Sequence, residues 1–244
     1  MLVDAHCHID LCKATVREVV SGDILIISNG TSLQSNKKVL EYAKIFPNVR
    51  AALGLYPTEA LKLSPKALKE VFKFIKDNKN KIVAVGEVGI DFYHITDPKE
   101  QKKEVDIFKQ VIDLANKINK PLIVHSRKAS EKALKLLKKA KVPVVMHCFD
   151  ANATQTHEAL ERGYYFTIPA NFWTRKGFKK TAQRVPIDRI LTETDSPFLS
   201  PVEGENKPAN VRYAVKKLAE IKQIPENKIE AQIYQNFKQI FIKD

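Results

Sequence analysis

Two histidines stand one residue apart near the start of the chain, in the segment MLVDAHCHID. Because side chains alternate along a strand, His6 and His8 would point to the same side and offer two neutral nitrogen ligands to one metal ion. Four more residues of metal-ligating type end other β-rich segments: Glu87, His125, His147 and Asp195. Four imidazoles and two carboxylates are enough for two divalent ions. A bridging Glu87 could hold the ions about 3.5–4 Å apart, as in two-metal hydrolases.

The segments that must position these residues are short, β-rich and regularly spaced. They cover residues 1–8, 23–30, 49–56, 82–91, 121–127, 142–149, 164–170 and 190–197. Between them, segments such as 104–118 repeat apolar residues three and four apart, which predicts helices. Ser64-Pro65 and Asp97-Pro98 each place a capping residue before a proline typical of a first helical turn. Strands that alternate with helices in 244 residues predict an α/β fold, a (β/α)8 TIM barrel in a single domain 1–244. A doubly wound open sheet is the alternative.

A barrel brings the ends of its parallel strands to one face, where barrel active sites are built. A lone histidine at a strand end is usually a hydrogen-bonded structural residue. Here, however, four of the six histidines fall late in three predicted strands, which favours a metal centre. Asp195 would then accept a proton from the attacking water. Glu193, two residues earlier, would either orient a ligating histidine or form a structural ion pair inside the barrel.

Five blocks of sequence resemble, in order, those of the TatD family of metal-dependent hydrolases in the amidohydrolase superfamily. They are DAHCHID (4–10), GEVGIDF (86–92), PLIVHSR (121–127), HCF (147–149) and TETDSP (192–197). The resemblance implies a metal-dependent hydrolase barrel in which His6, His8 and Asp195 bind one ion, His125 and His147 bind the other, and Glu87 binds both. It implies two divalent ions, Mg²⁺, Mn²⁺ or Zn²⁺, and exonucleolytic cleavage of DNA phosphodiester bonds.

The chain departs from the family pattern at three places. Tyr56 stands where the family has a histidine, and Asp150-Ala151 replaces a common Ser-Gly pair. The loop 202–208 is short and acidic, with Glu203 and Glu205 where arginines are usual. Because carboxylates repel phosphate, hydrolysis of another ester, such as deacylation of a D-aminoacyl-tRNA, is the alternative activity. A metal-binding protein without an open coordination position is the non-enzymatic alternative.

Substrate contacts are expected from side chains that follow the strands. These are Arg127, Tyr56, Asn171, Trp173 and Asn206. Arg127 could bind phosphate in bidentate fashion or form a structural ion pair. Trp173 could stack on a base or fill the end of the barrel.

The overall charge is +13, from 41 basic and 28 acidic residues. This charge suits a nucleic-acid partner, although lysines on solvated helix faces would give the same sum. No apolar run reaches the roughly 18 residues of a membrane helix, and three cysteines are too few for a disulfide framework. We therefore expect a cytoplasmic protein without a membrane partner. No dinucleotide or Walker motif predicts an organic cofactor. The sequence does not indicate an oligomeric state.

Overall fold

The computed structural model describes residues 1–242, and its eight strands form one sheet with the order β1 to β8. The strands are β1 Leu2–Cys7, β2 Ile24–Asn29, β3 Val49–Leu53, β4 Ala84–Gly89, β5 Leu122–His125, β6 Val144–Met146, β7 Tyr165–Pro169 and β8 Ile190–Glu193. Successive strands from β1 to β8 are parallel. The predicted (β/α) barrel is therefore confirmed, and each expected β segment contains a strand.

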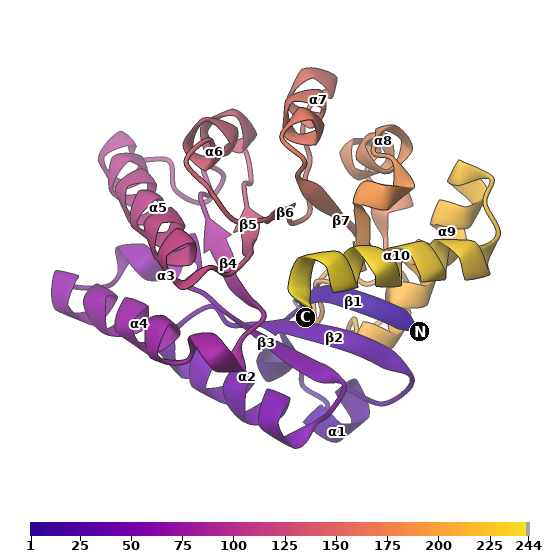
Figure 1. Ribbon diagram of the computed structural model, residues 1–244, viewed down its shortest axis with the longest axis horizontal. Helices are drawn as coiled ribbons and strands as arrows, with labels where there is room; N and C mark the ends of the chain where they lie inside the picture. The colour runs from indigo at the N-terminus through magenta and orange to yellow at the C-terminus, as the bar shows by residue number, and fades with distance from the viewer. Residues whose placement is uncertain (243–244) are drawn as a thin grey trace.

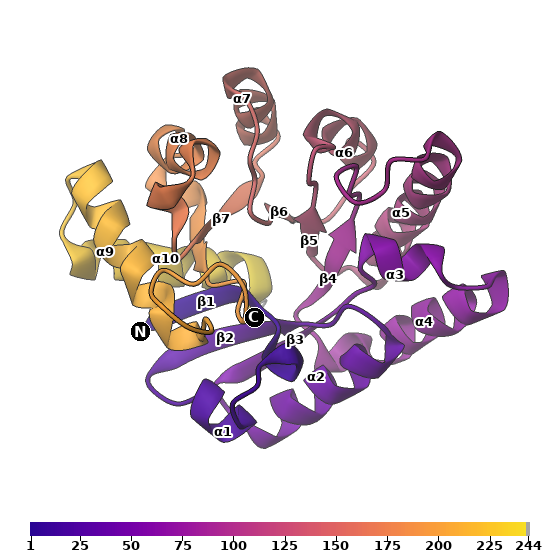
Figure 2. The same ribbon diagram turned by 180° about the vertical axis from the view of Figure 1, so that it is seen from behind.

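Helices surround the strands on the outside (Figures 1 and 2). They are α1 Val16–Val19, α2 Leu33–Ile45, α3 Pro57–Leu61, α4 Pro65–Asp77, α5 Pro98–Ile118, α6 Ser130–Leu137, α7 Ala153–Glu161, α8 Lys176–Arg184, α9 Val211–Lys222 and α10 Glu226–Phe241. Short 3-10 segments cover Ile9–Leu11, Lys79–Lys81, Phe172–Thr174, Ile187–Arg189 and Pro208–Asn210. Ser64 and Asp97 cap α4 and α5 with their side chains, ahead of the expected prolines. Within residues 1–242, no helix has the length and apolar character needed to cross a bilayer.

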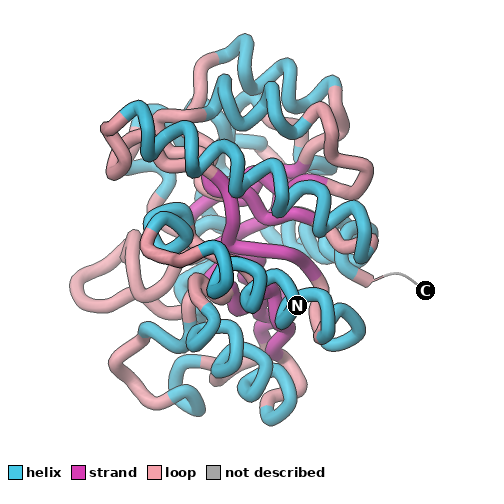
Figure 3. Tube along the Cα trace, turned by 90° about the vertical axis from the view of Figure 1, so that its left-hand side faces the viewer, coloured by secondary structure: helices cyan, strands magenta, loops and turns pink. Residues whose placement is uncertain are grey.

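The apolar core lies between the sheet and the helices, with the strands at the centre of the molecule (Figure 3). Phe108 and Ile112 of α5 and Ile75 of α4 are among its largest fully buried side chains. Cys7 is also buried, in a smaller apolar cluster with Val19 of α1 and Val49 of β3. The alternation predicted for the first strand therefore holds, because Cys7 packs towards the helices while its neighbours His6 and His8 face inward.

The first and last strands lie side by side and close the barrel through polar contacts. The fully buried carboxylate of Asp4 accepts hydrogen bonds from the backbone N–H and the hydroxyl of Thr194, at 2.9 and 2.5 Å. Burial, partly offset by these bonds, raises the pKa of Asp4 well above its usual range. Helix α10 packs against both β1 and β8. The backbone segments that lead to His6 and to Asp195 are therefore tied together one layer below them.

Candidate metal centre

All six residues proposed as metal ligands lie at the ends of strands, on the same face of the barrel. His6 is in β1 and His8 follows it, whereas Glu87 lies in β4 and His125 ends β5. His147 follows β6, and Asp195 lies two residues after β8. Backbone hydrogen bonds run from Asp195 N to His6 O (2.9 Å) and from His8 N to Ser196 O (2.7 Å). They hold the end of β1 in register with the segment that follows β8. The structure brings all six side chains together.

Four ligand atoms form the first group, and their spacing matches a single coordination shell. The Nε2 atoms of His6 and His8 are 3.2 Å apart. Glu87 Oε2 lies 3.6 and 3.3 Å from these two nitrogens. Asp195 Oδ1 lies 3.6 and 3.5 Å from them. Ligands about 2.0–2.1 Å from a tetrahedral ion are about 3.3–3.4 Å apart. This group has the donor types and the spacing to hold one divalent ion.

The second group of ligand atoms lies around Oε1, the other carboxylate oxygen of Glu87. His125 Nδ1 lies 2.9 Å from Glu87 Oε1. His147 Nε2 lies 3.7 Å from Glu87 Oε1 and 3.9 Å from Asp195 Oδ1. Glu87 is 3% exposed. Its Oε2 faces the first ligand group and its Oε1 the second, as in a bridging carboxylate. A second ion would fit between the two histidines and this oxygen.

Hydrogen bonds behind two of the histidines decide which ring nitrogen faces the centre. His8 Nδ1 lies 2.9 Å from the carbonyl of Asn29, which can only accept, so His8 carries a proton there and directs Nε2 towards the other ligand atoms. His147 Nδ1 lies 2.6 Å from Glu193 Oε2. The other oxygen of Glu193 accepts the backbone N–H of Cys148 at 3.1 Å. The contact fits both roles left open for Glu193, the orientation of a histidine and an ion pair inside the barrel.

His125 is held in the same way by Asp91, a residue that sequence reasoning missed. Asp91 Oδ2 lies 3.0 Å from His125 Nε2, 2.9 Å from the Tyr56 hydroxyl and 2.7 Å from His94 Nδ1. Asp91 is fully buried, and its backbone N–H donates to Glu104 Oε1 of α5 at 2.5 Å. The signal was its position two residues after β4, inside the GEVGIDF block. Tyr56, expected to contact substrate, instead directs its hydroxyl to Asp91.

Close approach of β4 to β5 places Glu87 beside His125. Gly89 ends β4 with φ +149°, and a Cβ atom there would lie 1.9 Å from the carbonyl oxygen of His125. A side chain at this position would push the two strands apart. Gly89 therefore permits the contact on which the second ligand group depends.

The carboxylates of the centre are ionised, and the pKa values of His8, His125 and His147 are raised, whereas burial lowers that of His6. Burial opposes ionisation of Glu87, but hydrogen bonds with His125, His6 and His8 outweigh it and hold the pKa of Glu87 well below its usual range. Burial likewise opposes ionisation of Asp195, and its bond to His8 nevertheless lowers the pKa. Burial would lower the pKa of His125, but its bonds to Asp91 and Glu87 raise it to about 9. The centre thus concentrates negative charge that protons neutralise when no cation does.

This balance predicts that metal binding releases protons. With a pKa of about 9, His125 is protonated at neutral pH, and a metal ion must displace the proton from Nδ1. Proton and metal compete, so the apparent affinity should rise with pH up to the pKa, by about tenfold per pH unit for each proton displaced. Calorimetric Mn²⁺ titrations at neutral pH, in two buffers of different ionisation enthalpy, measure this release. Equal heats in the two buffers would contradict it.

The residues expected to contact substrate take different positions. Arg127 is exposed, and its guanidinium carbon lies 3.8 Å from the ring centroid of Tyr93. Asn171 is 7% exposed, and its Oδ1 has no hydrogen-bond partner within residues 1–242. Trp173 is half-buried and packs edge-on against Phe172, with ring centroids 5.7 Å apart. The position of Trp173 matches the alternative in which it fills the end of the barrel.

Asn206 requires a correction, because its side chain supports the loop after β8. Its Nδ2 donates to the carbonyls of Thr194 and Phe198 at 2.8 and 2.7 Å. Its Oδ1 accepts from Lys207 N and Asn210 Nδ2 at 3.0 and 2.9 Å. The residue is 1% exposed, so no polar group is left for a substrate. Sequence reasoning could not tell a loop-supporting amide from a substrate-facing one.

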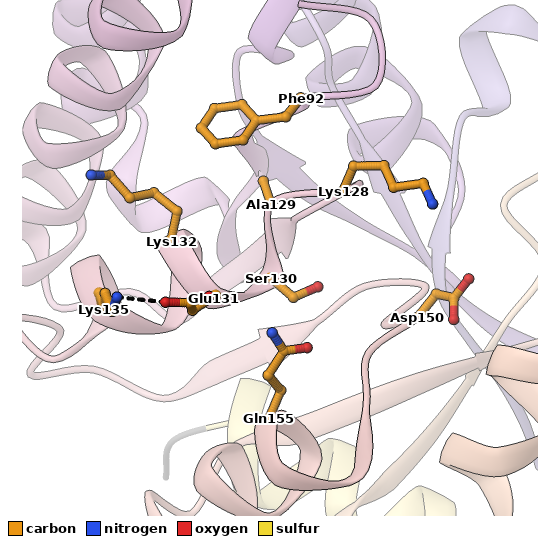
Figure 4. Close-up of a pocket in the computed structure, with 9 residues that line it drawn as sticks. All are labelled: Phe92, Lys128, Ala129, Ser130, Glu131, Lys132, Lys135, Asp150 and Gln155. Carbon is orange, nitrogen blue, oxygen red and sulfur yellow. Dashed lines mark hydrogen bonds and ion pairs between the residues drawn. The ribbon is translucent and has the colours of Figure 1, made fainter.

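A pocket of about 500 Å³ lies beside the centre, between the loops that follow β5 and β6 (Figure 4). Its lining residues are Phe92, Lys128, Ala129, Ser130, Glu131, Lys132, Lys135, Asp150 and Gln155. Lys135 is paired with Glu131, whereas Lys128 and Lys132 make no ion pair within residues 1–242. Gln155 directs its amide towards the segment that carries Ser130 and Glu131 (Figure 4). The pocket combines two unpaired cations with the carboxylate of Asp150 and with neutral hydrogen-bonding groups.

Comparison with known proteins identifies relatives over the whole chain. The family model described as TatD related DNase matches residues 3–242. A metal-dependent hydrolase of Methanocaldococcus jannaschii is 32% identical, over 98% of this chain and 96% of its own. A mouse protein provisionally named a deoxyribonuclease is 30% identical, over 99% of this chain and 88% of its own. The crystal structure of YJJV, a TatD homologue from Escherichia coli, has a TM-score of 0.88 at 24% identity and covers 100% of this chain and 98% of its own.

Proposed function

Because the chain belongs to the family of TatD-related DNases, which are metal-dependent hydrolases, we propose that it cleaves phosphodiester bonds of DNA and removes nucleotides from its ends. The observation that supports this proposal most is the pair of ligand groups that share the two oxygens of Glu87. A structural metal site is normally closed by four protein ligands. The second group offers fewer, so positions for water and substrate stay open there.

The donor set fits hard or borderline divalent cations, because it consists of imidazole nitrogens and carboxylate oxygens. In the proposed assignment, His6, His8 and Asp195 hold one ion and His125 and His147 the other, with Glu87 on both. Two bound ions of the Mg²⁺, Mn²⁺ or Zn²⁺ type would lower the pKa of water and offset the charge that grows on phosphoryl oxygens.

Asp195 is the proposed general base. Its side chain is 16% exposed, more than those of His6 and Glu87, so it can reach a water molecule at the open side of the centre. The lowered pKa keeps the carboxylate ionised at neutral pH and able to accept a proton. Asp195 can then return the proton to the leaving oxygen of the cleaved ester. Glu193 acts indirectly, by holding the ring of His147.

Arg127 is the proposed phosphate-binding residue. Stacking on Tyr93 fixes the plane of the guanidinium and leaves its N–H groups free for bidentate binding. Lys128 and Lys132 add positive charge in the adjoining pocket. The acidic loop opposes this charge, because Glu203 and Glu205 are both exposed, although Glu205 Oε2 accepts the backbone N–H of Lys13 at 3.0 Å. These two carboxylates keep deacylation of a D-aminoacyl-tRNA as the alternative.

Two parallel incubations test the proposal. Metal-loaded protein is mixed with end-labelled DNA and, separately, with a D-aminoacyl-tRNA, in the presence of Mg²⁺, Mn²⁺ or Zn²⁺. We expect stepwise loss of nucleotides from the DNA and an intact aminoacyl ester. Deacylation without nucleotide release would replace the proposed activity with the alternative. A preparation of the Asp195→Asn variant, purified in the same way, controls for contaminating nucleases.

A further inference from the structure

An exposed phenylalanine stands directly beside the candidate centre. Phe198 lies three residues after Asp195, and 54% of its surface is exposed. Its ring centroid is 6.4 Å from that of His8, at an interplanar angle of 66°. Scattered exposed apolar residues need no explanation. This one adjoins the ligand group that holds the proposed base.

Hydrogen bonds hold the backbone of Phe198 in place, although its ring is exposed. Its N–H donates to the carbonyl of Asp195 at 2.9 Å. Its carbonyl accepts from Asn206 Nδ2 at 2.7 Å, the buried amide that supports this loop. The backbone from which the ring projects is therefore held at a set position relative to Asp195. A flat group that packs against the ring would have to order only its two side-chain torsions.

A second aromatic residue lies on the other side of the barrel end. Tyr93 follows β4 and Phe198 follows β8, and strands four apart in an eight-stranded barrel lie opposite one another. One face of Tyr93 is covered by Arg127. The centre thus lies between a cationic group suited to phosphate and an uncovered ring suited to a flat, apolar partner.

We propose that Phe198 is a stacking surface for the nucleobase of the terminal nucleotide and thereby a specificity-determining residue. The inference rests on the proposed function. Nucleotides combine the two chemistries found here, because each carries an anionic phosphate and a flat base within one unit. Stacking of a base on an aromatic side chain accelerates a reaction only if the contact is kept in the transition state.

The test compares two DNA oligonucleotides of equal length. One carries thymidine at the end from which the wild-type protein digests, and the other an abasic nucleotide at that end. We expect the wild-type kcat/KM to be about 5- to 100-fold lower for the abasic end. Phe198→Leu keeps an apolar side chain but loses the aromatic face. It should lower kcat/KM for thymidine by a similar factor and leave the abasic value unchanged.

Two controls separate stacking from a structural role. Phe198→Trp retains an aromatic face and should keep the preference for the base-bearing end. The melting temperature and metal content of Phe198→Leu should equal those of the wild type, since the ring is exposed. Unchanged discrimination by Phe198→Leu, or an equal loss on both substrates, would overturn the inference alone. Cleavage of neither oligonucleotide by the wild type would overturn the proposed function, and the inference with it.

Discussion

Replacement of Asp195 by asparagine is expected to lower kcat by about 10²- to 10⁴-fold while metal stays bound. Asparagine retains an oxygen at the position of Oδ1, which lies 3.5 Å from His8 Nε2, but it cannot accept a proton from water. The backbone of residue 195 has φ 55°, in the left-handed region, which asparagine adopts readily. The variant should therefore fold as the wild type does.

Steady-state kinetics and elemental analysis of the same preparations measure the effect of Asp195→Asn. Asp195→Ala is the matched control, because it removes the ligand oxygen together with the base and should lose metal as well as activity. Wild-type turnover by Asp195→Asn with full metal content would mean that another group takes the proton. Loss of metal by Asp195→Asn would show that the carboxylate charge is needed for binding.

Replacement of Asp91 by asparagine should impair metal binding at His125, although Asp91 is not itself a proposed ligand. Asp91 Oδ1 accepts the backbone N–H groups of Tyr93 and His94, at 2.9 and 3.0 Å, so an asparagine would keep its oxygen there. Its NH₂ group would then face His125 Nε2 in place of the acceptor Oδ2. The ring would carry its proton on Nδ1, the nitrogen that faces Glu87. Disrupted supporting contacts of this kind typically cost about 10- to 100-fold in metal affinity or activity.

Two single substitutions test the other partners of Asp91. Tyr56→Phe removes the hydroxyl that contacts Asp91 and, at 3.5 Å, His125 Nε2, and His94→Gln removes the exposed imidazole. We expect both variants to stay within a few-fold of the wild type in Mn²⁺ affinity, measured by calorimetry. If Asp91→Asn also binds Mn²⁺ with wild-type affinity, the orientation of His125 does not depend on this carboxylate.

The sequence predicted the fold and the grouping of the six proposed ligands because both follow from local patterns. Regularly spaced β-rich segments and period-3.6 hydrophobicity between them indicated the alternating elements, and parallel strands bring their ends to one face. Strand parity sufficed to place His6 and His8 inward and Cys7 outward. The apolar neighbours of Cys7 bear this out.

The missed features depend on contacts between distant segments. Whether Asp91 faces His125 depends on the close approach of β4 and β5 at Gly89, which no local pattern shows. Asn206 was assigned to substrate, but its amide bonds to Thr194 and Phe198 across a loop whose path the sequence does not reveal. Glu205 reaches the backbone of Lys13, almost at the other end of the chain. In each case, the residue type was known from the sequence, but the partner towards which the side chain is directed could not be predicted.

Anomalous diffraction from crystals grown with Mn²⁺ would locate the bound ions. We expect two peaks on opposite sides of the Glu87 carboxylate. One peak should lie among His6, His8 and Asp195, and the other between His125 and His147. A single peak would limit the chemistry to one ion. Peaks elsewhere, or no bound manganese in crystals of intact protein, would contradict the account.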